Sequence, residues 1–173
     1  GIRMAGKVVA ILGATGVVGR QMLQCLMERD FPVDRLVPLA SARSAGKTVS
    51  FCGGEVPIRE AVPEAFDGID IVLSAVGDEQ AQELLPEAVR RGAVCIDNIH
   101  AFRMDDDVPL VIPEINADDI ATHSGIISNP NCATTIGLVP LWPLHQAAGL
   151  IRVIASTYQA ASGAGKPGLD ELV

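Results

Sequence analysis

The sequence has few aromatic residues and no excess of positive charge. Phe, Trp and Tyr make up 3% of its 173 residues, and the formal net charge is −8. A negatively charged surface repels a phosphate backbone, so nucleic-acid binding is not expected. The chain also lacks a basic amphipathic segment and an apolar run long enough to span a bilayer, so no membrane association is expected. Apolar residues still account for 49% of the chain, which suits parallel strands buried beneath helices.

The cysteines do not form a metal-binding or disulfide pattern. Cys25, Cys52, Cys95 and Cys132 are scattered, and no C-x-x-C motif is present, so a zinc site is not predicted. The segment before the first apolar strand is too short to predict a signal peptide. Scattered thiols in an acidic chain are typical of a reducing compartment, and the sequence therefore predicts a cytoplasmic location.

Strands and helices alternate along the first three quarters of the chain. Lys7–Leu12 is a continuous apolar run that predicts a buried strand, and Val17–Asp30 repeats apolar residues at helical spacing. Pro38 in the second strand indicates a position near a sheet edge. The alternation predicts an α/β fold with an open, mostly parallel sheet. Further strands are expected over 35–40, 48–51, 55–58, 69–76, 93–97, 110–115 and 125–128, and a further helix over 79–91.

The pattern changes after Asn129, so we expect a first domain over residues 1–129. A helix is predicted over 132–144, interrupted or kinked at Pro140 and Pro143. Residues 150–159 are long enough for a strand of a second sheet, and residues 169–173 look like the start of another helix. Residues 130–173 are therefore expected to begin a second domain that is cut short.

A glycine motif follows the first predicted strand. Gly13 to Gly19 read G-x-x-G-x-x-G at the point where the first helix opens. Glycines permit a tight turn and let backbone N–H groups approach a pyrophosphate at a helix N-terminus. A glycine-rich turn without a ligand is the alternative, because the pattern alone is weak. The order of strand, turn and helix favours a dinucleotide.

The end of the second strand indicates which dinucleotide is bound. Enzymes that use NAD usually have a carboxylate there for the ribose hydroxyls, whereas residues 39–46 (LASARSAG) contain no acid. Arg43 can pair with a 2′-phosphate through charge-assisted hydrogen bonds, and Ser41 and Ser44 can donate to it. A solvated arginine in a polar loop is the alternative. The favoured cofactor is NADP.

Cys132 is the candidate nucleophile. The strand Gly125–Ser128 runs into a proline turn, and Cys132 then begins a predicted helix. The partial positive charge and free N–H groups of a helix N-terminus favour a thiolate and can stabilise an oxyanion. Cys25 in an amphipathic helix and Cys95 in an apolar strand are predicted to be structural. A structural role for Cys132 as well is the alternative.

With these motifs the chain resembles the aspartate-semialdehyde dehydrogenase family. The resemblance is carried, in the family's order, by residues 13–19, 41–46, 97–98, 101–105, 108–116, 128–135, 157–159 and 162–165. It implies a Rossmann-type NADP-binding domain over residues 1–129. It also implies that residues 130–173 begin an α+β catalytic and dimerisation domain, in a protein that is a homodimer when full length.

The resemblance also implies roles for single residues. Cys132 is implied to be the nucleophile, Asn131 to polarise the reacting carbonyl, and Gln159 to orient the substrate. Arg103 is implied to bind phosphate, with Asn98 beside it. Motifs and resemblance together predict cofactor contacts from Gly13, Ala14, Thr15, Gly16, Val17, Val18, Ser41, Arg43, Ser44, Ser74, Ala75, Ser162, Gly163 and Gly165.

The implied reaction is the reversible oxidation of aspartate semialdehyde with phosphate and NADP⁺ to aspartyl phosphate through a cysteine thioester. In the family this step belongs to the biosynthesis of lysine, threonine and methionine. The family's general acid/base histidine and the arginine for the substrate carboxylate would lie beyond Val173. This chain alone is therefore expected to be an incomplete, inactive enzyme.

Two features keep other interpretations open. Ile99 and His100 stand where the family commonly has two serines, and we interpret His100 as a loop residue beside the phosphate pocket. N-acetyl-glutamyl-phosphate reductase shares the glycine loop and the cysteine, but typically has Gly before the cysteine where this chain has Asn131. Glyceraldehyde-3-phosphate dehydrogenase fits less well. A non-catalytic NADP-binding module, in which Cys132 does no chemistry, is the alternative from another class.

Overall fold

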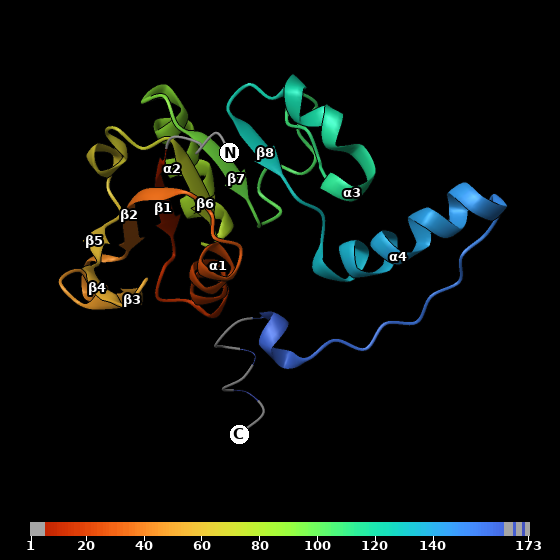
Figure 1. Ribbon diagram of the computed structural model, residues 1–173, viewed down its shortest axis with the longest axis horizontal. Coiled ribbons are helices and arrows are strands. Elements are labelled where there is room, and N and C mark those ends of the chain that lie inside the picture. The colour runs from red at the N-terminus through yellow and green to blue at the C-terminus, as the bar shows by residue number, and fades with distance from the viewer. Residues whose placement is uncertain (1–5, 165–167, 169–170, 172–173) are drawn as a thin grey trace.

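A parallel sheet of six strands forms the centre of the computed structural model, which describes residues 6–164, 168 and 171 (Figure 1). The strands are β1 (Lys7–Leu12), β2 (Val33–Ala40), β5 (Arg59–Glu60), β6 (Ile71–Ser74), β7 (Val94–Asp97) and β8 (Ile126–Ser128). They lie in the order β5-β2-β1-β6-β7-β8, and every neighbouring pair is parallel. This is the 3-2-1-4-5-6 order of a doubly wound, Rossmann-type sheet. The predicted α/β fold is confirmed.

Two helices cover opposite faces of the sheet. α1 (Val17–Glu28) packs through Leu23 against Val9 and Ile11, whereas α2 (Asp78–Arg90) packs through Leu85 against Ala10 and Leu12 on the other face. Because side chains alternate between the faces of a strand, a strand buried on both faces is apolar at successive positions. That explains why β1 reads as a continuous apolar run rather than as an alternating one.

The edge of the sheet beyond β2 is short. β5 pairs with β2 only at Leu39 and Ala40, so Pro38 sits beside a nearly open edge as predicted. An antiparallel hairpin of β3 (Thr48–Phe51) and β4 (Gly54–Pro57) follows and packs through Val49 and Val56 on the α1 side of the core. The short 3₁₀ turns η1 (Ala42–Ser44) and η2 (Pro63–Phe66) flank this part of the chain, and a third, η3 (Ala117–Thr122), precedes β8.

The strand predicted over 110–115 is wrong beyond its first residue. Leu110 forms a single parallel bridge with Ser128, and the chain then turns into the short helix α3 (Pro113–Asn116). Proline suits the first position of a helix, where its missing N–H costs nothing. The side chain of Asn116 holds the turn, because its Oδ1 accepts from the Ile112 N–H at 2.8 Å and its Nδ2 donates to the Leu110 carbonyl at 3.0 Å.

The helix that begins at the candidate nucleophile is longer than predicted. α4 (Cys132–Ala148) continues through Pro140 and Pro143 and ends at Gly149, whose φ of 67° is left-handed. The predicted interruption is therefore wrong. Each proline removes one backbone donor, and the remaining donors of the 17 residues carry the helix past both positions.

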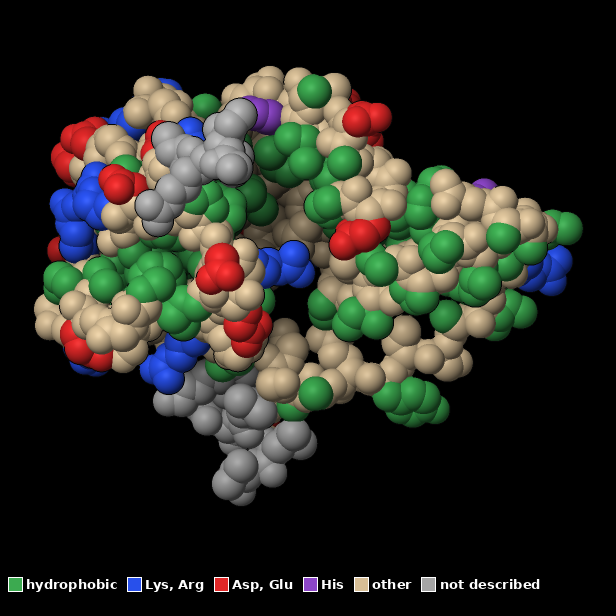
Figure 2. Space-filling model, in the orientation of Figure 1, with side chains coloured by type: hydrophobic (Ala, Val, Ile, Leu, Met, Phe, Trp, Pro, Cys, Tyr) green, Lys and Arg blue, Asp and Glu red, His purple; other side chains and the backbone are tan. Residues whose placement is uncertain are grey.

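The segment after α4 does not form the predicted strand. Residues 150–160 have no regular structure, and the short turn η4 (Ala161–Ala164) follows. Figure 1 shows α4 extending away from the sheet and the segment after it running back beneath α4, and Figure 2 shows apolar side chains along this part of the surface. Ile151 and Ile154 are exposed, and a strand needs a hydrogen-bonding neighbour that no described residue supplies here.

The helix predicted over 169–173 lies largely outside the described residues, and the domain boundary at residue 129 stays a prediction. Among the helices of the described residues, none combines the length and apolar character needed to cross a membrane.

Candidate functional site

The glycine loop between β1 and α1 is shaped by close backbone contacts. Gly13 has a φ of 91°, and a Cβ there would lie 2.6 Å from the carbonyl oxygen of Ala75. A Cβ on Gly19 would lie 2.2 Å from the Gly13 oxygen, so α1 can approach β1 only with glycine at this position. At Gly16 the corresponding distance is 3.3 Å, which is tight but not prohibitive. Gly13 and Gly19 therefore shape the loop itself, whereas Gly16 leaves open space at its surface.

The loop presents free backbone donors at the start of α1. The N–H groups of Gly13 and Ala14 both donate to the Leu39 carbonyl and anchor the loop to β2. Within the described residues, the N–H groups of Thr15, Val17 and Val18 have no backbone acceptor. Free N–H groups at a helix N-terminus attract anions such as a pyrophosphate. Val17 and Val18 could thus contact a ligand through these free N–H groups.

A cleft of about 490 Å³ lies above this loop, at the ends of β1, β2 and β6. It brings together six predicted cofactor residues from three segments: Gly13, Thr15, Gly16, Ser41, Arg43 and Ala75. The cleft therefore sits at the point where the strand order reverses, which is where open α/β sheets bind their ligands.

Other predicted cofactor residues do not line this cleft, among them Val17 and Val18 at the start of α1. Ala14 and Ser74 are fully buried beneath it, and Ser44 is half-buried in η1. Among the lining residues that sequence reasoning missed, Glu60 is the one that carries a charge. The parallel pairing of β5 with β2 sets Glu60 opposite Ala40, so a carboxylate reaches the end of β2 from a later strand. The alternation of strands carries no signal for such a short edge strand.

Cys132 is exposed at the first position of α4. Asn131 caps this helix, because its Oδ1 accepts from the Ala133 N–H at 2.9 Å. The carbonyl oxygen of Asn131 accepts from the Thr135 N–H at 2.9 Å. The predicted helix start is confirmed, and Cys132 stands in the positive field of a 17-residue helix.

The other cysteines have different surroundings. Cys95 is fully buried in β7, and burial raises the pKa of its thiol to about 12. Cys25 is half-buried on α1, as expected for a structural residue. Cys52 is exposed in the β3–β4 turn, at a φ of 48°. Cys132 and Cys52 are therefore the two exposed thiols, and only Cys132 begins a helix.

Arg103 joins the loops that follow β7 and β8. Its Nε donates to the Asn129 carbonyl at 2.8 Å, and its Nη2 donates to the Asn98 carbonyl at 3.2 Å. The Asn129 amide donates to the Asn98 Oδ1 at 2.6 Å. Arg103 is half-buried and is not simply a solvated side chain beside the acidic run at residues 105–107. The two residues implied to bind phosphate thus lie together in the loop after β7, and Arg103 connects this loop to the one that precedes the candidate nucleophile.

Three polar side chains lie buried in register beneath these loops. Ser74, Asp97 and Ser128 end β6, β7 and β8 and are all fully buried. Asp97 Oδ1 accepts from the Ile99 N–H at 3.3 Å, while its Oδ2 has no partner among the described residues. Burial raises the pKa of the Asp97 carboxyl. His100 Nε2 lies 2.9 Å from Asp78 Oδ2, and this contact ties the β7 loop to the start of α2.

The remaining predicted residues lie on the segment after α4. Gln159 is exposed, and Ser162 and Gly163 belong to η4. A Cβ on Gly163 would lie 2.0 Å from Gln159 Nε2, so these two residues touch. None of the three lines the dinucleotide cleft. Gly165 lies outside the described residues.

Comparison with known proteins gives a consistent picture. The sequence pattern described as semialdehyde dehydrogenase, NAD binding domain, matches residues 8–123. The aspartate-semialdehyde dehydrogenase of Bacillus subtilis (strain 168) is 52% identical over 167 residues, which are 96% of this chain and 48% of that protein. The chain therefore spans about half the length of the curated relatives it matches.

Solved structures agree with the sequence comparison. Aspartate semialdehyde dehydrogenase II from Vibrio cholerae, complexed with ASA, superposes with a TM-score of 0.91 at 47% identity, covering 96% of this chain and 50% of that one. The enzyme from Candida albicans, solved with NADP, superposes with a TM-score of 0.69 at 26% identity, covering 84% of this chain and 48% of that one. With its glycine loop, its sheet order and its matched residues, this chain belongs to the semialdehyde dehydrogenase family and carries that family's NAD-binding domain.

Proposed function

We propose that this chain forms the dinucleotide-binding and nucleophile-bearing part of an aspartate-semialdehyde dehydrogenase. The observation that carries the proposal is the place of Cys132. It is exposed at the N-terminus of α4, directly after the loop that leaves β8. β8 belongs to the same sheet as β1 and β2, whose ends form the dinucleotide cleft. The relatives that match 95–96% of the chain are named for this activity.

In the proposed reaction Cys132 attacks the aldehyde. A carbon–sulfur bond forms, and the carbonyl oxygen gains negative charge as a hemithioacetal. Backbone N–H groups of the first turn of α4 can donate to that oxygen. The amide nitrogen of Asn131 can do the same, because only its oxygen is used in capping the helix. Bound NADP⁺ supplies the hydride acceptor that turns the hemithioacetal into a thioester.

Phosphate completes the reaction. A phosphate oxygen attacks the thioester carbon, the carbon–sulfur bond breaks, and Cys132 leaves as a thiolate together with aspartyl phosphate. Arg103 is proposed to hold the phosphate, with Asn98 next to it, because a guanidinium matches phosphate oxygens. Gln159 is proposed to orient the substrate. The rest of the active site would come from the half of the relatives' length that this chain does not span.

NADP is the proposed cofactor, with Ser41, Arg43 and Ser44 at its 2′-phosphate. The lining of the cleft by Ser41 and Arg43 supports this choice, as does the Candida albicans relative solved with NADP. Ser162, Gly163 and Gly165 are proposed as further contacts of the same cofactor. We further propose that the full-length protein is a homodimer, and that it works in the cytoplasm, where its four free thiols stay reduced.

An assay of phosphate-dependent NADP⁺ reduction tests the reaction. The full-length protein is given aspartate semialdehyde, and Cys132→Ala is compared with Cys52→Ala, a matched loss of an exposed thiol. Cys132→Ala should lower kcat by about 10³-fold or more, and Cys52→Ala should leave it near the wild-type value. Comparable activity in both variants would exclude Cys132 as the nucleophile.

Thiol alkylation separates the enzyme from a non-catalytic module. In the native protein Cys132 should react with iodoacetamide faster than Cys52, because a helix N-terminus favours the thiolate. Cys95 should stay unmodified, since it is buried and its pKa is about 12. Peptide mapping after timed quenching gives all three rates. Equal rates at Cys132 and Cys52 would favour the non-catalytic module.

A further inference from the structure

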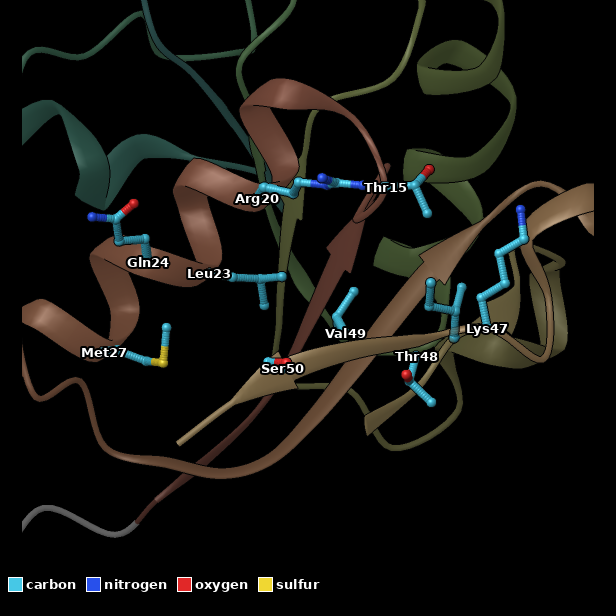
Figure 3. A pocket seen from close by; sticks show the side chains of 10 residues that line it. Thr15, Arg20, Leu23, Gln24, Met27, Lys47, Thr48, Val49 and Ser50 are labelled. Carbon is cyan, nitrogen blue, oxygen red and sulfur yellow. The ribbon is translucent and has the colours of Figure 1, made fainter. Parts of the chain in front are cut away.

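A second cleft adjoins the dinucleotide cleft. It has a volume of about 550 Å³ and lies between α1 and β3 (Figure 3). Leu23 and Val49 supply apolar lining, whereas Arg20 and Lys47 supply positive charge. Nothing in the proposed reaction uses this space.

Thr15 belongs to both clefts. It lines the dinucleotide cleft together with Arg43, and it lines the second cleft together with Arg20 and Lys47. In Figure 3 the guanidinium of Arg20 extends toward Thr15 from α1, and Lys47 rises on the other side from the segment before β3. The two clefts that share Thr15 therefore contain three cations from three different segments.

These cations are not neutralised by the protein. Among the described residues, no ion pair or side-chain hydrogen bond involves Arg20, Arg43 or Lys47. The chain as a whole carries a formal charge of −8, so this local group of unpaired cations differs in sign from the net charge of the protein. Such a group is an anion site when a cleft of suitable size lies beside it.

Glu60 explains why Arg43 alone would not suffice to bind a phosphate in this cleft. Its carboxylate lines the dinucleotide cleft beside Arg43 and repels a phosphate there. Arg43 and Glu60 together carry no net charge, so discrimination for a phosphate needs further positive charge nearby. Arg20 and Lys47 supply this positive charge. They line the second cleft, which shares Thr15 with the dinucleotide cleft but does not contain Glu60.

We propose that Arg20 and Lys47 complete the binding site for the 2′-phosphate of the cofactor and contribute to the preference for NADP over NAD. This inference rests on the proposed function, because it assumes that NADP occupies the dinucleotide cleft. The phosphate lies at Thr15, with Arg43 on one side and the Arg20–Lys47 pair on the other. NAD carries a hydroxyl at that position and gains nothing from the pair.

Fragments of the cofactor test the proposal directly. Calorimetry on the full-length protein measures the Kd of 2′,5′-ADP and of 5′-AMP, which differ in the 2′-phosphate. Arg20→Gln and Lys47→Gln should each weaken 2′,5′-ADP about threefold to fivefold, the range of an exposed charge pair, and the double variant about tenfold or more. Binding of 5′-AMP should not change. Raising the salt concentration should reduce the difference between wild type and variants.

Two further variants serve as a control and as a test of the cofactor assignment. Arg29→Gln removes a cation at the other end of α1, outside both clefts, and should leave both affinities unchanged. Arg43→Gln tests the proposed cofactor itself. If Arg43→Gln lowers the preference for 2′,5′-ADP but Arg20→Gln and Lys47→Gln do not, the proposal for Arg20 and Lys47 is wrong and NADP stands. If wild type binds 2′,5′-ADP no better than 5′-AMP, both proposals are wrong.

Discussion

Arg103 and Asn129 are joined by a hydrogen bond of 2.8 Å, from the guanidinium Nε to the backbone carbonyl. The same guanidinium also donates to the Asn98 carbonyl, so one side chain connects the loops after β7 and β8. A residue proposed to bind phosphate therefore also holds together the loops that precede the proposed nucleophile, Cys132. Changes at Arg103 should affect both stability and phosphate use.

Replacing Arg103 with Lys should separate charge from geometry. Lysine keeps the positive charge, but its single ammonium cannot reproduce the planar, two-point contact with both loops. We expect the KM for phosphate to rise several-fold and the free energy of unfolding to fall by about 1 kcal/mol. Steady-state kinetics and urea unfolding measure the two effects. Arg29→Lys is the control, and an unchanged phosphate KM in Arg103→Lys would contradict the assigned role.

Asn131 can be tested as a cap and as an amide donor. Asn131→Ala removes the acceptor for the Ala133 N–H and should destabilise the protein by about 1 kcal/mol. Asn131→Asp keeps the acceptor, so its stability should stay near that of wild type. The added carboxylate disfavours a thiolate at Cys132 and should slow its alkylation at neutral pH. An alkylation rate in Asn131→Asp equal to that of wild type would show that a charge at position 131 does not influence the Cys132 thiol.

The glycines of the loop should differ in the effect of a methyl group. Gly19→Ala places a Cβ 2.2 Å from the Gly13 oxygen and should cost about 3 kcal/mol or more in stability. Gly16→Ala meets its nearest atom at 3.3 Å, so the variant should fold. Its methyl group would instead occupy the open surface of the loop and weaken dinucleotide binding about tenfold. Thermal unfolding and cofactor titration distinguish the two, and the reverse order of effects would contradict the geometry.

The buried Asp97 should make stability depend on pH. Because burial raises its native pKa, unfolding releases a proton between the ordinary Asp pKa of about 3.9 and the raised value. The free energy of unfolding should therefore fall as pH rises through that window. Asp97→Asn keeps an acceptor for the Ile99 N–H and should be more stable than wild type above the window, by about 1 kcal/mol or more. Urea unfolding across the pH range measures the difference.

The control for Asp97 is Asp106→Asn, an exposed carboxylate in the acidic run. Its stability should follow wild type at every pH. A constant difference between wild type and Asp97→Asn, independent of pH, would mean that Asp97 has the same pKa in both states.

Local patterns were enough to predict most of the sheet and the start of each ligand-facing segment. The β1 run, the glycine motif and the turn before Cys132 each combine an apolar strand with a distinctive next few residues, and all three lie where the sequence placed them. What depends on a partner far along the chain was not predictable. Glu60 reaches the cleft only through a two-residue pairing with β2, and Arg103 finds its acceptor 26 residues away.

The two wrong strand predictions share a cause. Residues 110–115 are apolar enough for a strand, but Pro113 and the Asn116 side chain favour a turn once Leu110 has bridged to Ser128. Residues 150–159 have the composition of a strand without a neighbour among the described residues to pair with. Strand propensity describes fit to a sheet, and a sequence cannot show whether that sheet is there.

The strand order reverses between β1 and β6, and this reversal separates two groups of proposed site residues along the sheet. Residues proposed to choose the cofactor follow β1 and β2, whereas residues proposed to handle the substrate follow β7 and β8. Substitutions in the two groups share no contacts, so their energetic effects should add. On these proposals, substitutions at Arg20, Arg43 and Lys47 should change the preference between NADP and NAD and leave the reactivity of Cys132 unaltered.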